Sequence, residues 1–178
     1  VNGVLHRALN QAVMLDYIPK NPCFGVSLPH SEPVEMHPLT QDELNAFTAS
    51  IAGNEYETLF KVAVFTGMRQ SEIMALTWDR INFAAGTILV DRQLIREKKK
   101  GGAFKLTSPK NSKPRKLTPA PAVIKLLQEQ KRFQAARRLQ AGALWNDGGF
   151  PGLVFTNVFG GHYCHNALCR NAQKCAAL

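Results

Sequence analysis

Hydrophobic residues recur at three- and four-residue steps over positions 2–18, and this spacing predicts an amphipathic helix. The helix should end near Ile18, because Pro19 and Pro22 follow and proline cannot continue a helix. The segment 22–38 contains four prolines and no periodic pattern, which predicts an extended linker and a domain boundary. The apolar positions of the helix are Val4, Leu5, Ala8, Leu9, Ala12, Val13 and Tyr17.

Three helices are predicted after the linker. Thr40 and Glu43 have the spacing of a capping box, in which each side chain bonds the other residue's backbone amide, and this starts a helix over 41–52. A second apolar stripe predicts a helix that reaches Thr66–Gly67, and a third, short helix covers 71–76. This part of the chain should be all helical.

Short β-runs replace the helical pattern after Trp78. A hairpin with a polar tip at 109–114, which carries Lys110, should join the last two runs. A long helix over 120–143, a short apolar strand at 153–155 and a final helix near 166–177 complete the prediction. We therefore expect an α+β fold, mainly helical with a small antiparallel three-stranded sheet. The predicted β-runs are 81–83, 87–90, 103–107 and 115–117.

Charge is concentrated in one part of the chain. The formal net charge of the 178 residues is +9. The stretch 98–138 has thirteen basic residues and one acid, Glu129, so it carries +12. A block of this kind suits a polyanion such as DNA, where neutralised phosphates release counterions. The alternative is a merely solvated basic face.

Several other classes are disfavoured by the sequence. It has no apolar run of about 18 residues and no signal-peptide layout at its start, so we expect a soluble, cytoplasmic protein without a membrane partner. None of its four cysteines lies in a C-x-x-C pair, so we expect free thiols. The chain starts without Met and ends at Cys175-Ala-Ala-Leu, which suggests a piece of a longer protein.

The segment 65–78 places Arg69 between two helices. Gly67 permits a left-handed turn and Ser71 can cap the next helix, so Arg69 should lie on a short connector. A fixed guanidinium can bind a phosphate bidentately and neutralise charge that develops on a phosphoryl oxygen. Arg69 and Glu72 are three positions apart, so the two side chains could equally form an ordinary ion pair at a helix end.

The run TGMRQSEIMALTW, continued by the residues at 79–83, resembles the first active-site box of the tyrosine recombinases, the phage and transposon integrases. By that resemblance Arg69 contacts the scissile phosphate and Glu72 supports the site. The run SPKNSKPRKLTP at 108–119 resembles the family's β-hairpin, which implies that Lys110 protonates the leaving 5′ oxygen. Lys113 is the competing assignment. From the residues alone, Lys110 could also be a solvated hairpin lysine.

The resemblance also implies a domain plan. Residues 1–22 would be the last helix of a core-binding domain, 23–38 an interdomain linker, and 39–178 the N-terminal part of the catalytic domain. The full protein would cut and rejoin double-stranded DNA at attachment sites through a phosphotyrosyl intermediate, self-associate on DNA as a tetramer, and need no metal or other cofactor. Besides the catalytic residues, we expect DNA contacts from Lys98, Lys99, Lys100, Lys105, Lys113, Arg115 and Lys116.

The family's second box, His-x-x-Arg, and its nucleophilic Tyr have no counterpart here, so the fragment itself should be inactive. Tyr17 and Tyr56 fall on apolar helical stripes and are expected in the core, while Tyr163 precedes the place of the missing box. A non-catalytic DNA-binding module is the alternative function. It explains the charge but not the pairing of the Arg69 box with the Lys110 hairpin.

A group of potential metal ligands lies near the end of the chain. Histidine and cysteine are the usual zinc ligands, but the spacings here are irregular and match no closed zinc module. We therefore expect ordinary buried or half-buried thiols and no metal site. The group consists of His162, Cys164, His165, Cys169 and Cys175.

Overall fold

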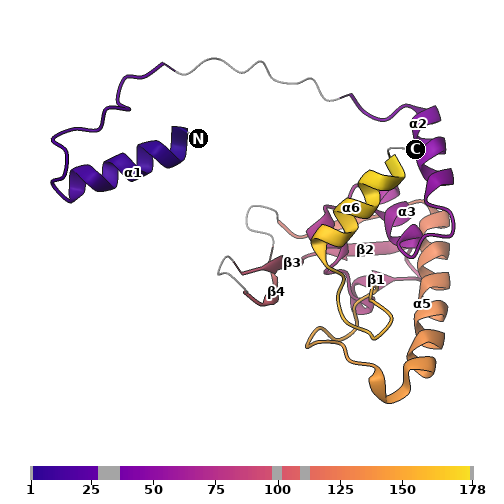
Figure 1. Ribbon diagram of the computed structural model, residues 1–178. Helices are drawn as coiled ribbons and strands as arrows, with labels where there is room; N and C mark the ends of the chain where they lie inside the picture. The colour runs from indigo at the N-terminus through magenta and orange to yellow at the C-terminus, as the bar shows by residue number, and fades with distance from the viewer. Residues whose placement is uncertain (1, 28–36, 98–101, 109–112, 177–178) are drawn as a thin grey trace. The chain divides into compact units, whose positions relative to one another are not determined.

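The computed structural model describes residues 2–27, 37–97, 102–108 and 113–176. The chain divides into two compact units, residues 1–38 and residues 39–178 (Figure 1). No helix within the described ranges is long and apolar enough to cross a membrane.

The first unit holds helix α1, Asn2–Met14, which ends four residues before the predicted Ile18. The chain then turns back, and the buried Asn21 bonds the helix. Its Nδ2 donates to the carbonyl of His6 at 3.0 Å and to Oδ1 of Asn10 at 2.6 Å. These bonds secure the return of the chain. Tyr17 lies outside the helix and is 78% exposed, so its predicted core position is wrong.

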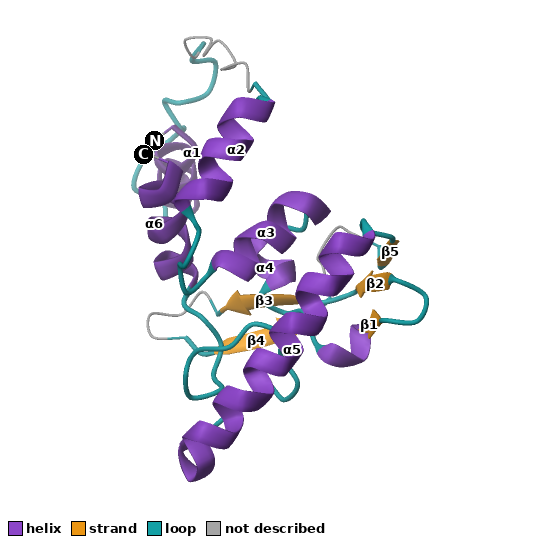
Figure 2. Ribbon diagram, turned by 90° about the vertical axis from the view of Figure 1, so that its right-hand side faces the viewer, coloured by secondary structure: helices purple, strands orange, loops and turns teal. Residues whose placement is uncertain are grey.

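The second unit begins with three helices, α2 (Gln41–Ser50), α3 (Glu57–Thr66) and α4 (Gln70–Ile73). The predicted capping box of α2 is confirmed: the amide of Thr40 donates to Glu43 Oε2 at 2.8 Å, and Thr40 Oγ1 accepts from the amide of Glu43 at 3.3 Å. Helix α3 buries Leu59, Phe60 and Val62. It lies beside α5, Pro121–Ala141, whose Val123, Ile124 and Leu127 are buried (Figure 2).

The described residues of this unit form two small antiparallel sheets. The three-stranded sheet has the order β1 (Ile81–Asn82), β2 (Thr87–Val90) and β5 (Arg115–Leu117). The two-stranded sheet pairs β3 (Gln93–Arg96) with β4 (Phe104–Thr107). The α+β architecture and a three-stranded antiparallel sheet are thus present, as predicted.

The predicted hairpin between 103–107 and 115–117 is wrong. Strand β4 pairs with β3, where Leu94 faces Leu106, while β5 pairs with β2, where Ile88 faces Leu117. The sequence carries little strand signal for β3, because its only apolar residues, Leu94 and Ile95, stand between polar ones. Leu94 is nevertheless fully buried, so packing favours a strand there.

After α5 the chain makes a short 3₁₀ turn, η2 (Gly142–Leu144), and an irregular segment before α6, His165–Ala176. The strand predicted at 153–155 is only an isolated bridge between Thr77 and Leu153. Side chains of α5 make the hydrogen bonds to this segment's backbone that a neighbouring strand would otherwise make. Nε2 of Gln134 donates to the carbonyl of Leu153 at 2.9 Å, and Nε2 of Gln130 donates to that of Val154 at 3.2 Å.

Candidate active site

The turn between α3 and α4 holds Arg69 in a defined backbone conformation. Gly67 ends α3 with a φ of 63°, a left-handed conformation that favours glycine. The next side chain, Met68, is buried in the core. Arg69 then takes an extended conformation and becomes the residue before α4. The turn therefore fixes the base of the Arg69 side chain on a short connector, as the sequence predicts. Ser71, expected to cap the next helix, lies inside α4 instead.

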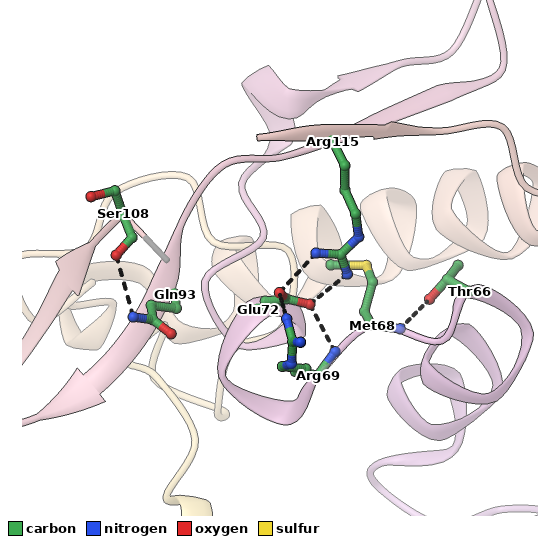
Figure 3. Close-up of polar contacts among 7 residues, drawn as sticks. All are labelled: Thr66, Met68, Arg69, Glu72, Gln93, Ser108 and Arg115. Carbon is green, nitrogen blue, oxygen red and sulfur yellow. Dashed lines mark hydrogen bonds and ion pairs between the residues drawn. The ribbon is translucent and has the colours of Figure 1, made fainter. Parts of the chain in front are cut away.

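Glu72 is the centre of the polar contacts in this turn. It is only 2% exposed. Its Oε2 accepts the backbone amide of Arg69 at 2.9 Å, and its Oε1 accepts Nη1 of Arg69 at 3.0 Å. One carboxylate thus restrains both the backbone and the guanidinium of the arginine (Figure 3).

Arg115 of β5 approaches the same carboxylate from the other side. Its Nη1 donates to Oε1 of Glu72 at 2.9 Å and its Nη2 donates to Oε2 at 2.7 Å. This is the two-pronged geometry that makes arginine–carboxylate pairs strong. The pair joins the three-stranded sheet to helix α4, across 43 positions of sequence. Figure 3 shows the carboxylate held between the two arginines.

The electrostatics of the cluster keep Glu72 ionised. The hydrogen bonds from Arg115 are the largest influence on the pKa of Glu72 and lower it. Burial raises this pKa, and the bonds from Arg69 lower it further, so that it falls to about 2. The same contact raises the pKa of Arg115. Glu72 is therefore a fixed anion at neutral pH and not a proton donor. Two guanidinium groups against one carboxylate leave the cluster with one positive charge.

The two interpretations of Arg69 are compatible. Its Nη1 makes the ion pair with Glu72, yet its side chain remains 67% exposed. A guanidinium offers five N–H donors in a fixed fork, so an ion pair with Glu72 does not by itself exclude a phosphate contact. The exposed side chain can be reached by an anion from solvent.

The remaining predicted residues are only partly within the described ranges. Lys105 is exposed on β4, with its Nζ 3.1 Å from Glu97 Oε1. Lys113 and Lys116 are also exposed. Arg115, also expected to contact DNA, lies 34% exposed and bonds Glu72. Four further lysines, Lys98, Lys99, Lys100 and Lys110, lie outside the described residues.

In the part of the chain that is described, no three His, Cys, Asp or Glu side chains converge on a metal position. His162 and His165 instead pack on Phe104, with ring centroids 4.3 and 5.7 Å apart. Burial lowers the pKa of both histidines. Cys175 is buried and Cys169 is exposed, and both are free thiols.

Two of the three tyrosines pack together in the second unit. The rings of Tyr56 and Tyr163 are 4.8 Å apart, edge to face. Tyr163 is buried, and burial is the main reason that its pKa rises to about 12. This phenol is packed in the core and strongly favours its protonated form. Burial therefore adds a physical reason against Tyr163 as the nucleophile to the one from its sequence position.

Comparison with known proteins agrees with this geometry. The chain is 28% identical to the tyrosine recombinase XerC-like protein of Caldanaerobacter subterraneus subsp. tengcongensis over 187 residues, 98% of this chain and 48% of that protein. It is 29% identical to an integrase of Streptomyces ambofaciens over 168 residues, 90% of this chain and 41% of that protein. The chain thus spans about half the length, or less, of these relatives.

Solved structures establish the fold. The Tn1549 transposon integrase in complex with a circular intermediate DNA superposes with a TM-score of 0.67 at 22% identity, covering 97% of this chain and 56% of that one. A lambda integrase dimer bound to a core site gives 0.60 at 15% identity, covering 99% and 57%. The fold is that of a tyrosine-recombinase catalytic domain.

Residues 37–144 match the sequence profile of the Phage integrase family. This range includes the Arg69 turn and the α5 helix, more than half of the chain. The protein therefore belongs to the Phage integrase family of tyrosine recombinases.

Proposed function

We propose that this chain carries the first part of the catalytic centre of a site-specific DNA recombinase that integrates or excises a mobile element. The observation that supports this most is the exposed guanidinium of Arg69, held at its base by the buried carboxylate of Glu72. The Arg69 side chain is 67% exposed, so a ligand from solvent can reach it. The arrangement suits an anion that arrives from outside, such as a DNA phosphate.

In this proposal Arg69 binds a non-bridging oxygen of the scissile phosphate. Charge grows on that oxygen as a tyrosine hydroxyl attacks phosphorus and the bond to the 5′ oxygen breaks. A guanidinium fixed in advance stabilises this charge without reorganisation. Glu72 is the positioning residue, because it holds the backbone and one nitrogen of Arg69 in place. The tyrosine comes from a longer protein that includes this chain.

Lys110 supplies the proton that the departing 5′ oxygen needs, which is general acid catalysis. Lys113 remains the competing residue for that role. Rejoining reverses the step: a 5′ hydroxyl attacks the phosphotyrosyl bond and the lysine recovers the proton. The reaction conserves the number of phosphodiester bonds, so it needs neither a high-energy cofactor nor a redox partner.

The proposed partner is double-stranded DNA at attachment sites, bound in the cytoplasm. The exposed Lys105, Lys113 and Lys116 would contact its phosphates, together with Lys98, Lys99 and Lys100. Similar proteins support this: the Tn1549 integrase structure contains a circular intermediate DNA, and a lambda integrase tetramer is bound to a Holliday junction. We propose that the longer protein likewise assembles on its DNA as a tetramer.

The domain plan is part of the proposal. Residues 1–22 would close a core-binding domain, 23–38 would link the domains, and 39–178 would begin the catalytic domain. The chain by itself would bind DNA without cutting it, because Tyr163 is buried against Tyr56 and the family's second box and nucleophilic tyrosine have no counterpart in it.

The test is covalent trapping. The longer protein is mixed with duplex DNA that carries the ends of its own mobile element, and protein–DNA adducts are resolved under denaturing conditions. We expect adducts from the longer protein and none from residues 1–178 alone. Arg69→Ala should reduce adduct formation by about 100- to 1,000-fold. Salt-sensitive DNA binding with no adduct from the longer protein would instead favour a non-catalytic DNA-binding module.

A further inference from the structure

A groove lies along the C-terminal half of α5, and its lining shares no residue with the Arg69, Glu72 and Arg115 cluster. Its volume is about 530 Å³, within the range of pockets that hold small organic groups. The lining combines aromatic rings with cations. The aromatic residues are Trp78, Trp145 and Phe150, and the cations are Lys131 and Arg138.

A second hollow of about 440 Å³ adjoins this groove and shares Lys131 and Ala135 with it. It adds Phe83 and Arg132 to the surface. The Nζ of Lys131 lies 5.7 Å from the centre of the Trp78 ring and 5.3 Å from that of Phe83. These contacts hold the ammonium against two aromatic faces between the hollows.

Positive charge dominates this surface. Lys131, Arg132 and Arg138 are all exposed, and Asp147 is the single acid among the described residues that line the two hollows. Seven positions separate Lys131 from Arg138, which is about two helical turns or roughly 10 Å along the axis. The two cations therefore stand on one side of α5 at a spacing that an extended polyanion can follow.

The aromatic rings are fixed before any ligand arrives. Trp78 Nε1 donates to Gln134 Oε1 at 2.7 Å, and Gln134 is itself bonded to the carbonyl of Leu153. Gly160 lies so close to Trp145 that a Cβ there would be 2.5 Å from the ring. Rings held in this way lose little freedom when a flat group stacks on them.

We propose that this groove binds an unpaired stretch of DNA, with a base against the tryptophan-lined hollow and phosphates at Lys131 and Arg138. Aromatic platforms beside a cationic track are the general chemistry of single-strand binding. An acidic peptide would use the cations but leave the rings without flat partners. This ligand differs from the duplex at Arg69, so the proposal goes beyond the proposed function.

The two tryptophans allow a direct test. The whole chain contains only Trp78 and Trp145, and both line the groove. Titration with oligothymidylate, which forms little structure of its own, should quench the tryptophan fluorescence. An abasic deoxyribose-phosphate chain of equal length and charge should bind more weakly and quench little. Equal quenching by the abasic chain or by oligoglutamate would overturn the proposal.

Matched variants separate the groove from net charge. Lys131→Ala with Arg138→Ala should weaken oligothymidylate binding by roughly tenfold, because two charge-assisted phosphate contacts are lost. Lys125→Ala with Lys174→Ala removes the same charge from exposed positions outside the groove, and should change affinity less than about threefold. Affinity is read by anisotropy of a labelled oligonucleotide, which does not depend on tryptophan emission. Equal losses in both double variants would contradict a defined groove.

Discussion

Glu72 lies between two guanidinium groups, and its contacts explain why an acid follows Arg69 by three residues. The spacing lets the side chain reach back to the amide of Arg69, as in a capping box. Arg115 then compensates the burial of this charge with two bonds. Burial removes water from the Glu72 carboxylate, and without Arg115 only the bonds from Arg69 would compensate for that lost solvation.

Replacement of Glu72 tests whether the bonds from Arg115 compensate for burial of its charge. Glu72→Gln should lower the free energy of unfolding by about 3 kcal/mol, because Arg115 would keep a partly buried charge without its counter-ion. Glu57→Gln is the control: it breaks a partly exposed ion pair with Lys61 and should cost less than about 1 kcal/mol. Urea unfolding followed by circular dichroism measures both. Similar losses in the two variants would contradict the structural importance of the Glu72 cluster.

Acid stability should fall in two pH ranges. Burial lowers the pKa of His162 and His165 in the fold. As the pH falls, the unfolded chain therefore binds protons at these histidines before the folded chain does. The free energy of unfolding should begin to fall as the pH drops below about 6.5. Glu72 has a pKa of about 2 in the fold against 4.5 normally. Its contribution, about 3 kcal/mol, is present above pH 4.5 and is lost between 4.5 and 2. Glu72→Gln should reduce the loss in the lower range and leave the upper range unchanged, which unfolding at a series of pH values would reveal.

At the scale of elements, α5 organises the irregular segment that follows it. Gln134 replaces strand pairing for residues 153–154 and also bonds Thr156 Oγ1 at 3.0 Å. Gly160 then brings the chain against Trp145, with a φ of 93°. These long-range contacts hold the segment without a regular strand.

The contact of Gly160 with Trp145 predicts a specific sensitivity. Gly160→Ala should destabilise the fold by about 2–4 kcal/mol, since it adds a clash with the ring to the strain of a positive φ. Gly86→Ala is a matched control, because Gly86 has a φ of 62° with nothing within 4 Å of an added Cβ. It should cost about 1–2 kcal/mol. Thermal unfolding compares the two, and an equal shift in Tm would argue against the Trp145 contact.

Local sequence signals predicted local structure well. The capping box at Thr40 and the glycine turn before Arg69 depend on residues a few positions apart, and both are confirmed. The partner of Glu72 could not be predicted in this way, because Arg115 lies 43 positions away in a basic run. No pattern in that run distinguishes the partly buried guanidinium from its solvated neighbours. Strand β3 was missed for a similar reason, since its burial depends on packing against α4.

At the scale of the whole molecule, the charge distribution predicts how the chain binds duplex DNA. The +12 carried by residues 98–138 should give weak binding without strong sequence preference, through phosphate contacts. Affinity should fall steeply between about 50 and 200 mM salt. Fluorescence anisotropy with two unrelated duplexes measures this. Binding that ignores salt, or no binding at low salt, would contradict the prediction.

The central claim is that Arg69 acts on the phosphate while Lys110 acts on the leaving oxygen. The decisive measurement is cleavage by the longer protein of a substrate with sulfur at the 5′ bridging position, because sulfur departs without a proton. Lys110→Ala should be slow on normal DNA and recover most of its rate on this substrate, whereas Arg69→Ala should stay slow on both. If only Lys113→Ala recovers its rate on the sulfur substrate, the general acid is Lys113 and not Lys110. Rescue of Arg69→Ala, or normal cleavage by it, would contradict the account.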